Sequence, residues 1–234
     1  ITADHVFASV KGFRGHSSAL VILDRGTKWI ESHTSALKDV HSVKEAFKRF
    51  ISSKPAEGPI YFYSDKAGEL QEAARSLGWI TDAAPPGDKH ASGVAERAVR
   101  TAKEGARCAL IQAGLPEYFW PLAIRHFCQA VSISRNYKKE DSPWQRRYGK
   151  NFDGKPFIFG QRVEFLPYCP KFQPSKFGPQ TVDGIFVGYK WLAGPSKFKH
   201  DYLCIAVDDL HARIKEKRIF RVFIHETKMV TTAA

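Results

Sequence analysis

The chain is poor in cysteine, and its few cysteines stand alone. They are Cys108, Cys128, Cys169 and Cys204. No two of them have the spacing of a zinc site, and nothing in the pattern suggests a disulfide framework. We therefore expect a reducing compartment, either nucleus or cytoplasm. The scattered histidines do not complete a zinc-ligand pattern either, so a zinc site within these residues is not expected.

Long apolar runs are also missing. Hydrophobic residues make up 43% of the 234 residues, but no stretch reaches the roughly 18 consecutive apolar residues of a membrane span. No secretory signal pattern opens the chain. We expect no membrane partner. Because Ile1 follows no initiator methionine, we also expect the sequence to be a fragment of a longer protein.

Acidic residues are scarce relative to basic ones. The chain has 36 Lys and Arg against 24 Asp and Glu, which gives a formal net charge of +12. The excess per residue is larger after residue 137 than before it. A surplus of this size predicts a polyanionic partner, most simply nucleic acid. The plainer alternative is a solvated basic surface.

Apolar periodicity in the first part of the chain predicts alternating strands and helices. The expected strands are 1–10, 18–24, 29–33, 60–63 and 79–81, and the expected helices are 39–52, 68–77, 93–113 and 117–136. Asp39 is a suitable N-cap for the first helix. This order of elements fits an α/β fold with a mixed sheet flanked by helices.

The character of the sequence changes after Asn136. Proline and glycine suggest a loop-rich crossing, followed by strand-like runs at 161–166, 184–189, 202–207 and 219–225. Short strands separated in this way predict a small β-barrel. We therefore predict an α/β domain at 1–137, a linker at 138–160 and a small, basic, β-barrel-like domain at 161–234.

Three acidic residues far apart in the sequence are candidate metal ligands. Asp4 lies in the first expected strand, Asp65 closes the apolar run that begins at Ile60, and Glu96 stands at the start of a basic helix. Carboxylates that converge from two strands and a helix can bind Mg²⁺ through oxygen, and a pair of such ions can cleave a phosphodiester. Taken singly, Asp65 could be a helix N-cap, Glu96 a partner of the helix dipole, and Asp24 competes with Asp4.

Basic residues follow Glu96 along the same expected helix, at Arg97, Arg100, Lys103 and Arg107. Arg100 and Lys103 are four and seven residues beyond Glu96, so they share its helix face. Cations that run away from a metal-bound carboxylate could hold a phosphate backbone across a cleavage site. The alternative is a solvated face with Glu–Arg pairing.

Several motifs resemble integrases. The segment Gly93-Val94-Ala95-Glu96-Arg97 resembles the third-carboxylate motif of retroviral and retrotransposon integrases, and Ser64-Asp65-x-x-Gly68-Glu69 is similar to their second motif. Later segments resemble the copia-type branch: Phe119-Trp120-x-x-Ala123, Ser142-Pro143-Trp144, Phe157-x-Phe159-Gly160 and Gly184-Ile185-Phe186-Val187-Gly188-Tyr189. The matches run in the family's order over most of the chain.

The resemblance implies an RNase H-like mixed five-stranded sheet flanked by helices, with a mostly-β C-terminal domain. It implies that Asp4, Asp65 and Glu96 are the catalytic residues and hold two Mg²⁺ or Mn²⁺ ions. The basic residues from Arg97 to Arg107 would then bind DNA. The implied activity is cleavage of retrotransposon ends and strand transfer into target DNA. Such a chain would come from a Pol polyprotein, act as a homo-oligomer, and work in the nucleus after a cytoplasmic particle stage.

The sequence also departs from the family pattern. Lys66-Ala67 stands where the family has asparagine-glycine, and Ser92 replaces the asparagine before the third motif. These changes keep a second hypothesis open, in which the chain is a catalytically decayed or domesticated DNA-binding module. A third, a nuclease acting on RNA–DNA hybrids, is disfavoured by the copia-type segments.

Overall fold

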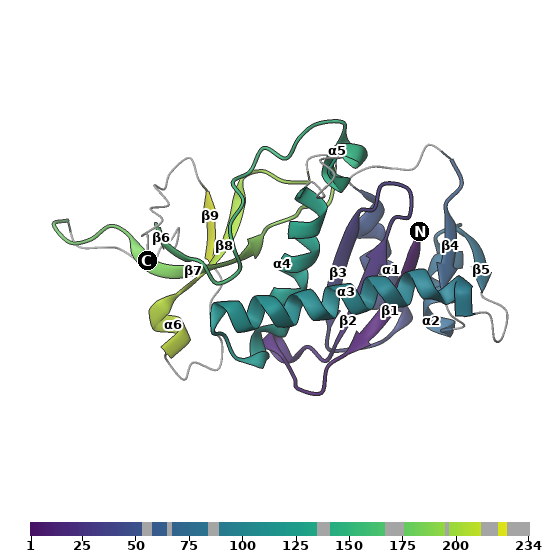
Figure 1. Ribbon diagram of the computed structural model, residues 1–234, viewed down its shortest axis with the longest axis horizontal. Coiled ribbons are helices and arrows are strands. Elements are labelled where there is room, and N and C mark those ends of the chain that lie inside the picture. Colours follow the sequence, from purple (N-terminus) through teal and green to yellow (C-terminus); the bar gives the residue numbers. More distant parts are fainter. Residues whose placement is uncertain are drawn as a thin grey trace.

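Two β-sheets and the helices around them make up the fold (Figure 1). The computed structural model describes residues 1–52, 58–64, 67–83, 89–134, 141–166, 176–194, 197–211 and 220–223. Cys108, Cys128 and Cys204 are free thiols, while Cys169 lies outside these ranges. Among the described residues, no helix has both the length and the apolar character that crossing a membrane requires.

The first sheet has the mixed, five-stranded form that the sequence predicted. Its strands are β1 (Thr2–Phe7), β2 (Ser18–Leu23), β3 (Ile30–Ser35), β4 (Tyr61–Ser64) and β5 (Ile80–Ala83). They lie in the order β3-β2-β1-β4-β5. The three strands β1 to β3 pair antiparallel, whereas β4 runs parallel to both β1 and β5. The strand β1 is therefore central, and the parallel half of the sheet begins beside it.

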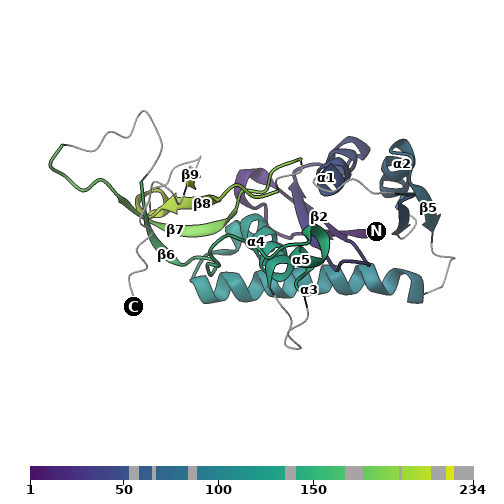
Figure 2. The same cartoon turned by 90° about the horizontal axis from the view of Figure 1, so that it is seen from above.

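Helices cover both faces of this sheet, as Figure 2 shows from above. Helices α1 (Val40–Ser52) and α2 (Gly68–Ser76) lie on one face, and α3 (Lys89–Ala113) and α4 (Trp120–Ile133) on the other. The pleat of β2 sends Leu20 and Ile22 into the core with α1, and Ala19 and Val21 into the core with α3 and α4. Both faces of the central strands are thus buried in separate apolar clusters.

One predicted helix cap is confirmed, and the starts of two helices differ from the prediction. Asp39 caps α1 as predicted, since its Oδ1 accepts the N–H of Ser42 at 2.8 Å. Helix α3 begins at Lys89, four residues before the expected 93. Residues 117–119 form a 3₁₀ turn ahead of α4 rather than the start of one long helix.

The second sheet is antiparallel and follows chain order. It consists of β6 (Arg162–Phe165), β7 (Val182–Tyr189), β8 (Asp201–Ala206) and β9 (Phe220–Phe223), with a short α6 (Val207–His211) after β8. Among the described residues, β6 and β9 are the outer strands of this sheet, and the barrel-like form expected for 161–234 stays a prediction. The sheet buries side chains of β7 against α4. The predicted domain boundaries stay a prediction.

Helix α4 joins the two sheets through two polar side chains. Ser132 Oγ donates to the carbonyl of Ile30 in β3 at 2.9 Å and accepts the N–H of Ile30 at 3.1 Å. One helical turn earlier, Gln129 Nε2 donates to the carbonyl of Tyr189 in β7 at 2.8 Å, and its Oε1 accepts the N–H of Tyr189 at 3.0 Å. Each side chain thereby pairs with backbone groups at the end of a strand, as a further strand would.

A short helix, α5 (Pro143–Tyr148), lies within the expected loop-rich crossing. Ser142 is its N-cap and accepts the N–H of Gln145 at 3.1 Å, and Gly149 ends it with a φ of 71°. Trp144 and Arg147 of this helix are buried. Arg147 Nη2 donates to the carbonyl of Phe50 at 2.6 Å, so α5 is attached to the end of α1.

We predict that His126 makes stability depend on pH. It is buried, its Nε2–H donates to the carbonyl of Phe157 at 3.1 Å, and burial lowers its pKa from 6.5 to about 4. As pH falls below 6.5, His126 becomes protonated in the unfolded chain but stays neutral in the folded chain. Stability is therefore lost between pH 6.5 and 4. Urea unfolding should show about 2 kcal/mol less stability at pH 5 than at pH 7.5 from this group alone.

His126→Gln is the matched variant, because its amide can donate to the same carbonyl but does not titrate. Its unfolding free energy should change less between pH 7.5 and pH 5 than that of the wild type. Parallel losses in the two proteins would rule out His126 as the source.

Candidate active site

Asp4 lies in the middle of the central strand β1, opposite Val21 of β2. Strand alternation places it on the same face as Val6, which packs against the core shared with α3 and α4. The side chain is partly buried, and its Oδ1 accepts the N–H of His5 at 2.6 Å. Asp4 therefore stands on the face of the sheet that α3 covers.

Strand β4 runs beside β1 and in the same direction. Thr2 pairs with Tyr63, and Thr2 Oγ1 donates to the Tyr63 carbonyl at 2.8 Å. The last described residue of β4 is Ser64, and both Asp65 and Lys66 lie outside the described residues. The assignment of Asp65 as a ligand therefore stays a prediction.

Helix α3 packs its small residues inward and carries its charges outward. Ala95, Ala102 and Ala106 are buried, and Gly105 lets the ring of Phe127 on α4 approach so closely that a Cβ would collide with it. The outward residues are exposed: Glu96, Arg97, Arg100, Lys103 and Arg107. Because α3 packs against both β1 and β4, this helix and the strand of Asp4 are direct neighbours.

The exposed cations form a continuous row along α3 beyond Glu96. Arg97 Nε donates to the carbonyl of Gly93 at 3.0 Å within the helix. Lys103 and Arg107 border a groove of about 480 Å³ that also includes Val6 and Phe7 of β1. The row therefore runs from the start of α3 to the end of the strand that holds Asp4, and exposed cations in such a row can contact successive phosphates.

The described residues place two of the three predicted metal ligands on neighbouring elements. Among them, no group of three or more His, Cys, Asp or Glu side chains is placed to hold a metal ion. Asp4 and Glu96 come from neighbouring elements, and the third proposed ligand, Asp65, is not described. The donor atoms of the predicted set are all carboxylate oxygens, which suit Mg²⁺ or Mn²⁺.

Asp24, the alternative to Asp4 as a metal ligand, accepts hydrogen bonds within the turn that follows β2. Its Oδ1 accepts the N–H of Gly26 at 2.9 Å, and its Oδ2 accepts the hydroxyl of Thr27 at 2.7 Å and lies 3.5 Å from Nη1 of Arg147. Burial alone would raise the pKa of Asp24, but these hydrogen bonds lower it. These contacts give Asp24 a structural role between β2 and α5.

A buried ionic cluster was not predicted from the sequence. Glu31 of β3 is buried and lies 2.8 Å from Nζ of Lys197, 3.3 Å from Nε2 of His33, and accepts the indole N–H of Trp29 at 2.9 Å. Burial alone would raise the pKa of Glu31, but Lys197 and His33 lower it to about 2. The sequence does show an acidic residue, Glu31, within an expected strand. Its partner Lys197 is 166 residues later in the chain, so the pairing could not be recognised from the sequence.

Of three comparisons with known proteins, only the one with solved structures found similar chains. A scan of protein-family models found no match, and a search of curated proteins found none either. Among solved structures, the chain is similar to the catalytic core domain of BIV integrase, at 14% identity and a TM-score of 0.45, over 62% of this chain and 91% of that one.

Two further solved structures are similar. The HTLV-2 integrase catalytic core domain in complex with magnesium, in a trimeric form, matches at 16% identity and a TM-score of 0.47, over 62% of this chain and 93% of that one. The simian T-cell lymphotropic virus intasome in complex with the PP2A regulatory subunit B56 gamma matches at 12% identity and a TM-score of 0.49, over 100% of this chain and 78% of that one. These likenesses concern the backbone alone, and the description of the fold rests on strand order and pairing.

We predict that Asp24 matters for stability. Asp24→Ala should lower the free energy of unfolding by about 2–3 kcal/mol, because it removes the turn hydrogen bonds and leaves Arg147 buried without its carboxylate. Asp24→Asn, which keeps an acceptor for the N–H of Gly26, should lose less. Urea unfolding measures both, and an Asp24→Ala protein as stable as the wild type would contradict the structural role.

Proposed function

We propose that this chain is the integrase catalytic core of a copia-type retrotransposon Pol polyprotein, which binds DNA, cleaves its 3′ ends and transfers them to target DNA. One observation carries the proposal. Asp4 lies on the face of the central strand that α3 covers, and α3 presents Glu96 followed by a row of exposed cations. The motifs around Glu96 and after residue 119 support the copia-type origin.

In this proposal Asp4, Asp65 and Glu96 hold two Mg²⁺ or Mn²⁺ ions. Bound there, the ions would activate a water and stabilise the leaving oxygen of a phosphodiester. Asp4 is fixed by the sheet on both sides, since β2 and β4 flank β1. Glu96 stands on a long helix anchored by its buried alanines. Rigid elements of this kind hold ligand oxygens in place better than loops do.

DNA is the proposed partner, with Arg97, Arg100, Lys103 and Arg107 contacting its phosphates. The formal charge of +12 favours a polyanion in general, and the row on α3 gives that attraction a direction. We also propose a homo-oligomer as the active form and the nucleus as the place of action, after a cytoplasmic particle stage. The magnesium and the intasome named for the similar structures belong to those proteins.

We predict that Glu96→Gln abolishes Mg²⁺-dependent strand transfer by the purified chain on a retrotransposon-end duplex, while DNA affinity stays within about twofold. The amide keeps the shape of the side chain but loses the anionic oxygen that a metal requires. Glu104→Gln on the same helix is the matched control, because Glu104 is also exposed and its substitution removes the same charge. Equal strand transfer by Glu96→Gln and wild type would remove Glu96 from the reaction.

We predict that the α3 cations set the salt dependence of DNA binding. The double variant Arg100→Gln/Lys103→Gln should lower the slope of log K against log salt by about 2, because each lost phosphate contact releases about one counterion fewer. Lys150→Gln, an exposed charge away from α3, should leave the slope almost unchanged. Fluorescence anisotropy at several salt concentrations measures the slopes. Identical slopes for wild type and the double variant would place DNA elsewhere.

The alternative is a catalytically decayed or domesticated DNA-binding module. Lys66 after Asp65 favours it, because a cation beside the proposed ligands opposes metal binding. Calorimetry with Mn²⁺ separates the two functions. If neither wild type nor Asp65→Asn binds the ion, while both bind duplex DNA with a steep salt dependence, the binding module is the correct function.

A further inference from the structure

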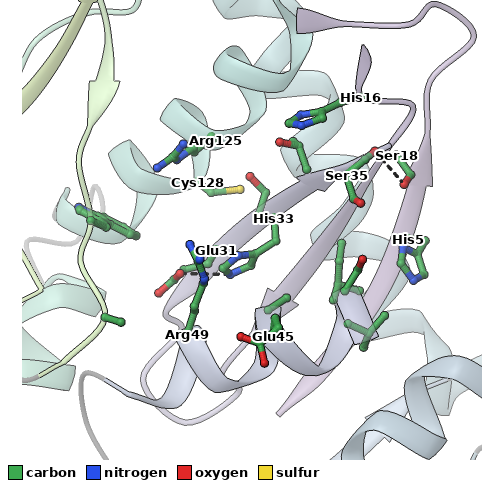
Figure 3. A pocket seen from close by; sticks show the side chains of 18 of the residues that line it. His5, His16, Ser18, Glu31, His33, Ser35, Glu45, Arg49, Arg125 and Cys128 are labelled. Carbon is green, nitrogen blue, oxygen red and sulfur yellow. Dashed lines mark hydrogen bonds and ion pairs between the residues drawn. The ribbon is translucent and has the colours of Figure 1, made fainter. Parts of the chain in front are cut away.

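A second basic cavity lies at the outer strand β3 and includes no residue of α3. It has a volume of about 370 Å³ and is bounded by β3, α1, α4, residues 191–193 and Lys197 (Figure 3). A cavity of this size is within the range of small-ligand sites. The α3 row that we assign to DNA thus lies outside it.

Acidic groups in this cavity are already paired. Glu31 is held by Lys197, His33 and Trp29, and Glu45 on α1 lies 2.8 Å from Nζ of Lys48. Both carboxylates therefore already have a paired cation, and Glu31 is also close enough to Arg125 for its charge to raise the pKa of that guanidinium.

Two guanidinium groups in the cavity have no such partner. Neither Arg49 of α1 nor Arg125 of α4 has a side-chain hydrogen bond or ion pair with another described residue. Figure 3 shows both on the same side of the pocket, with Glu31 and His33 beside Arg49. Burial lowers the pKa of Arg125, the charge of Glu31 raises it, and the charge of Arg49 lowers it, so the two guanidinium groups are close enough to repel each other. Because Glu31 is already paired with Lys197, the cavity keeps an excess of positive charge that a further anion would offset.

A third group points to an anion. The Nδ1 atom of His16, which also lines the cavity, is buried and has no hydrogen-bond partner within the described part of the chain. An unpaired buried nitrogen costs free energy unless a ligand or water completes it. Arginine forks match the oxygens of a phosphate, and histidine can donate to the same group.

We propose that this cavity binds a phosphate-bearing anion, with Arg49 and Arg125 as the charged donors and His16 as a further donor. The bound group relieves the repulsion between the two guanidinium groups and occupies the space between α1 and α4. Its source is either a free polyphosphate or the backbone of a nucleic acid, and both offer the same oxygens. The site stands apart from the proposed catalytic carboxylates, so it does not depend on metal binding or strand transfer.

The test is isothermal titration calorimetry of the full chain with inorganic pyrophosphate, without divalent metal. Wild type should give saturable binding. Arg125→Gln and Arg49→Gln should each weaken it by about tenfold or more, because each removes a charge-assisted hydrogen bond. Lys150→Gln should bind like the wild type, since it removes the same charge from an exposed position that does not line the cavity. Arg49 is exposed, so its variant is expected to fold even where Arg125→Gln does not.

A DNA-binding arm separates the two sources. If the double variant Arg49→Gln/Arg125→Gln loses both pyrophosphate and affinity for a short DNA duplex, the cavity holds a backbone phosphate. If it loses pyrophosphate alone, the natural ligand is a free polyphosphate. The proposal is overturned if wild type shows no saturable heat, or if the folded Arg49→Gln protein binds pyrophosphate as tightly as wild type and Lys150→Gln do.

Discussion

The arrangement depends on helix α4 being held between two sheets by side chains that imitate a strand. Ser132 satisfies both backbone groups of Ile30 at the start of β3, and Gln129 does the same for Tyr189 at the end of β7. These groups are buried, so leaving any of them unpaired would cost more than the hydrogen bonds gain. The pairing fixes the height of α4 on the first sheet and the position of β7 beside it. Helix α3 packs against α4 through Gly105, so the row of charges on α3 is positioned by the same contact.

Charge in this protein follows burial. The cations of α3 are exposed and free to meet a large anion, whereas Lys197 and Arg147 are buried and each lies against a carboxylate. Burying a charge is affordable only with a partner, and both pairs join segments far apart in the sequence. The Glu31–Lys197 pair attaches the segment before β8 to β3. The Asp24–Arg147 pair attaches α5 to the turn after β2. The same principle singles out Arg49 and Arg125, whose charges face a cavity without a described partner.

The sequence predicted the mixed sheet well because its strands and helices alternate with clear apolar periodicity, and β1 to β5 formed where expected. It missed α5, although Ser142-Pro143 and Gly149 are its capping signals, because six residues carry too little periodicity to stand out. It also predicted the four strands of the second sheet, but strand patterns do not show that β7 packs against α4. Ser132 and Gln129 could not be recognised at all, because their role depends on residues 102 and 60 positions away. For the site, the motif located Glu96 on an exposed helix and Asp4 on the facing strand, while Asp65 rests on the motif alone.

We propose that the carboxylates of Asp4 in β1, of Asp65 and of Glu96 in α3 share divalent metal. Anomalous diffraction from crystals grown with Mn²⁺ tests it most directly. The account predicts metal density between Asp4 and Glu96, with Asp65 as a common ligand and metal–oxygen bonds of about 2.1 Å. Density elsewhere, or three carboxyl groups directed to separate surfaces with no metal among them, would contradict it.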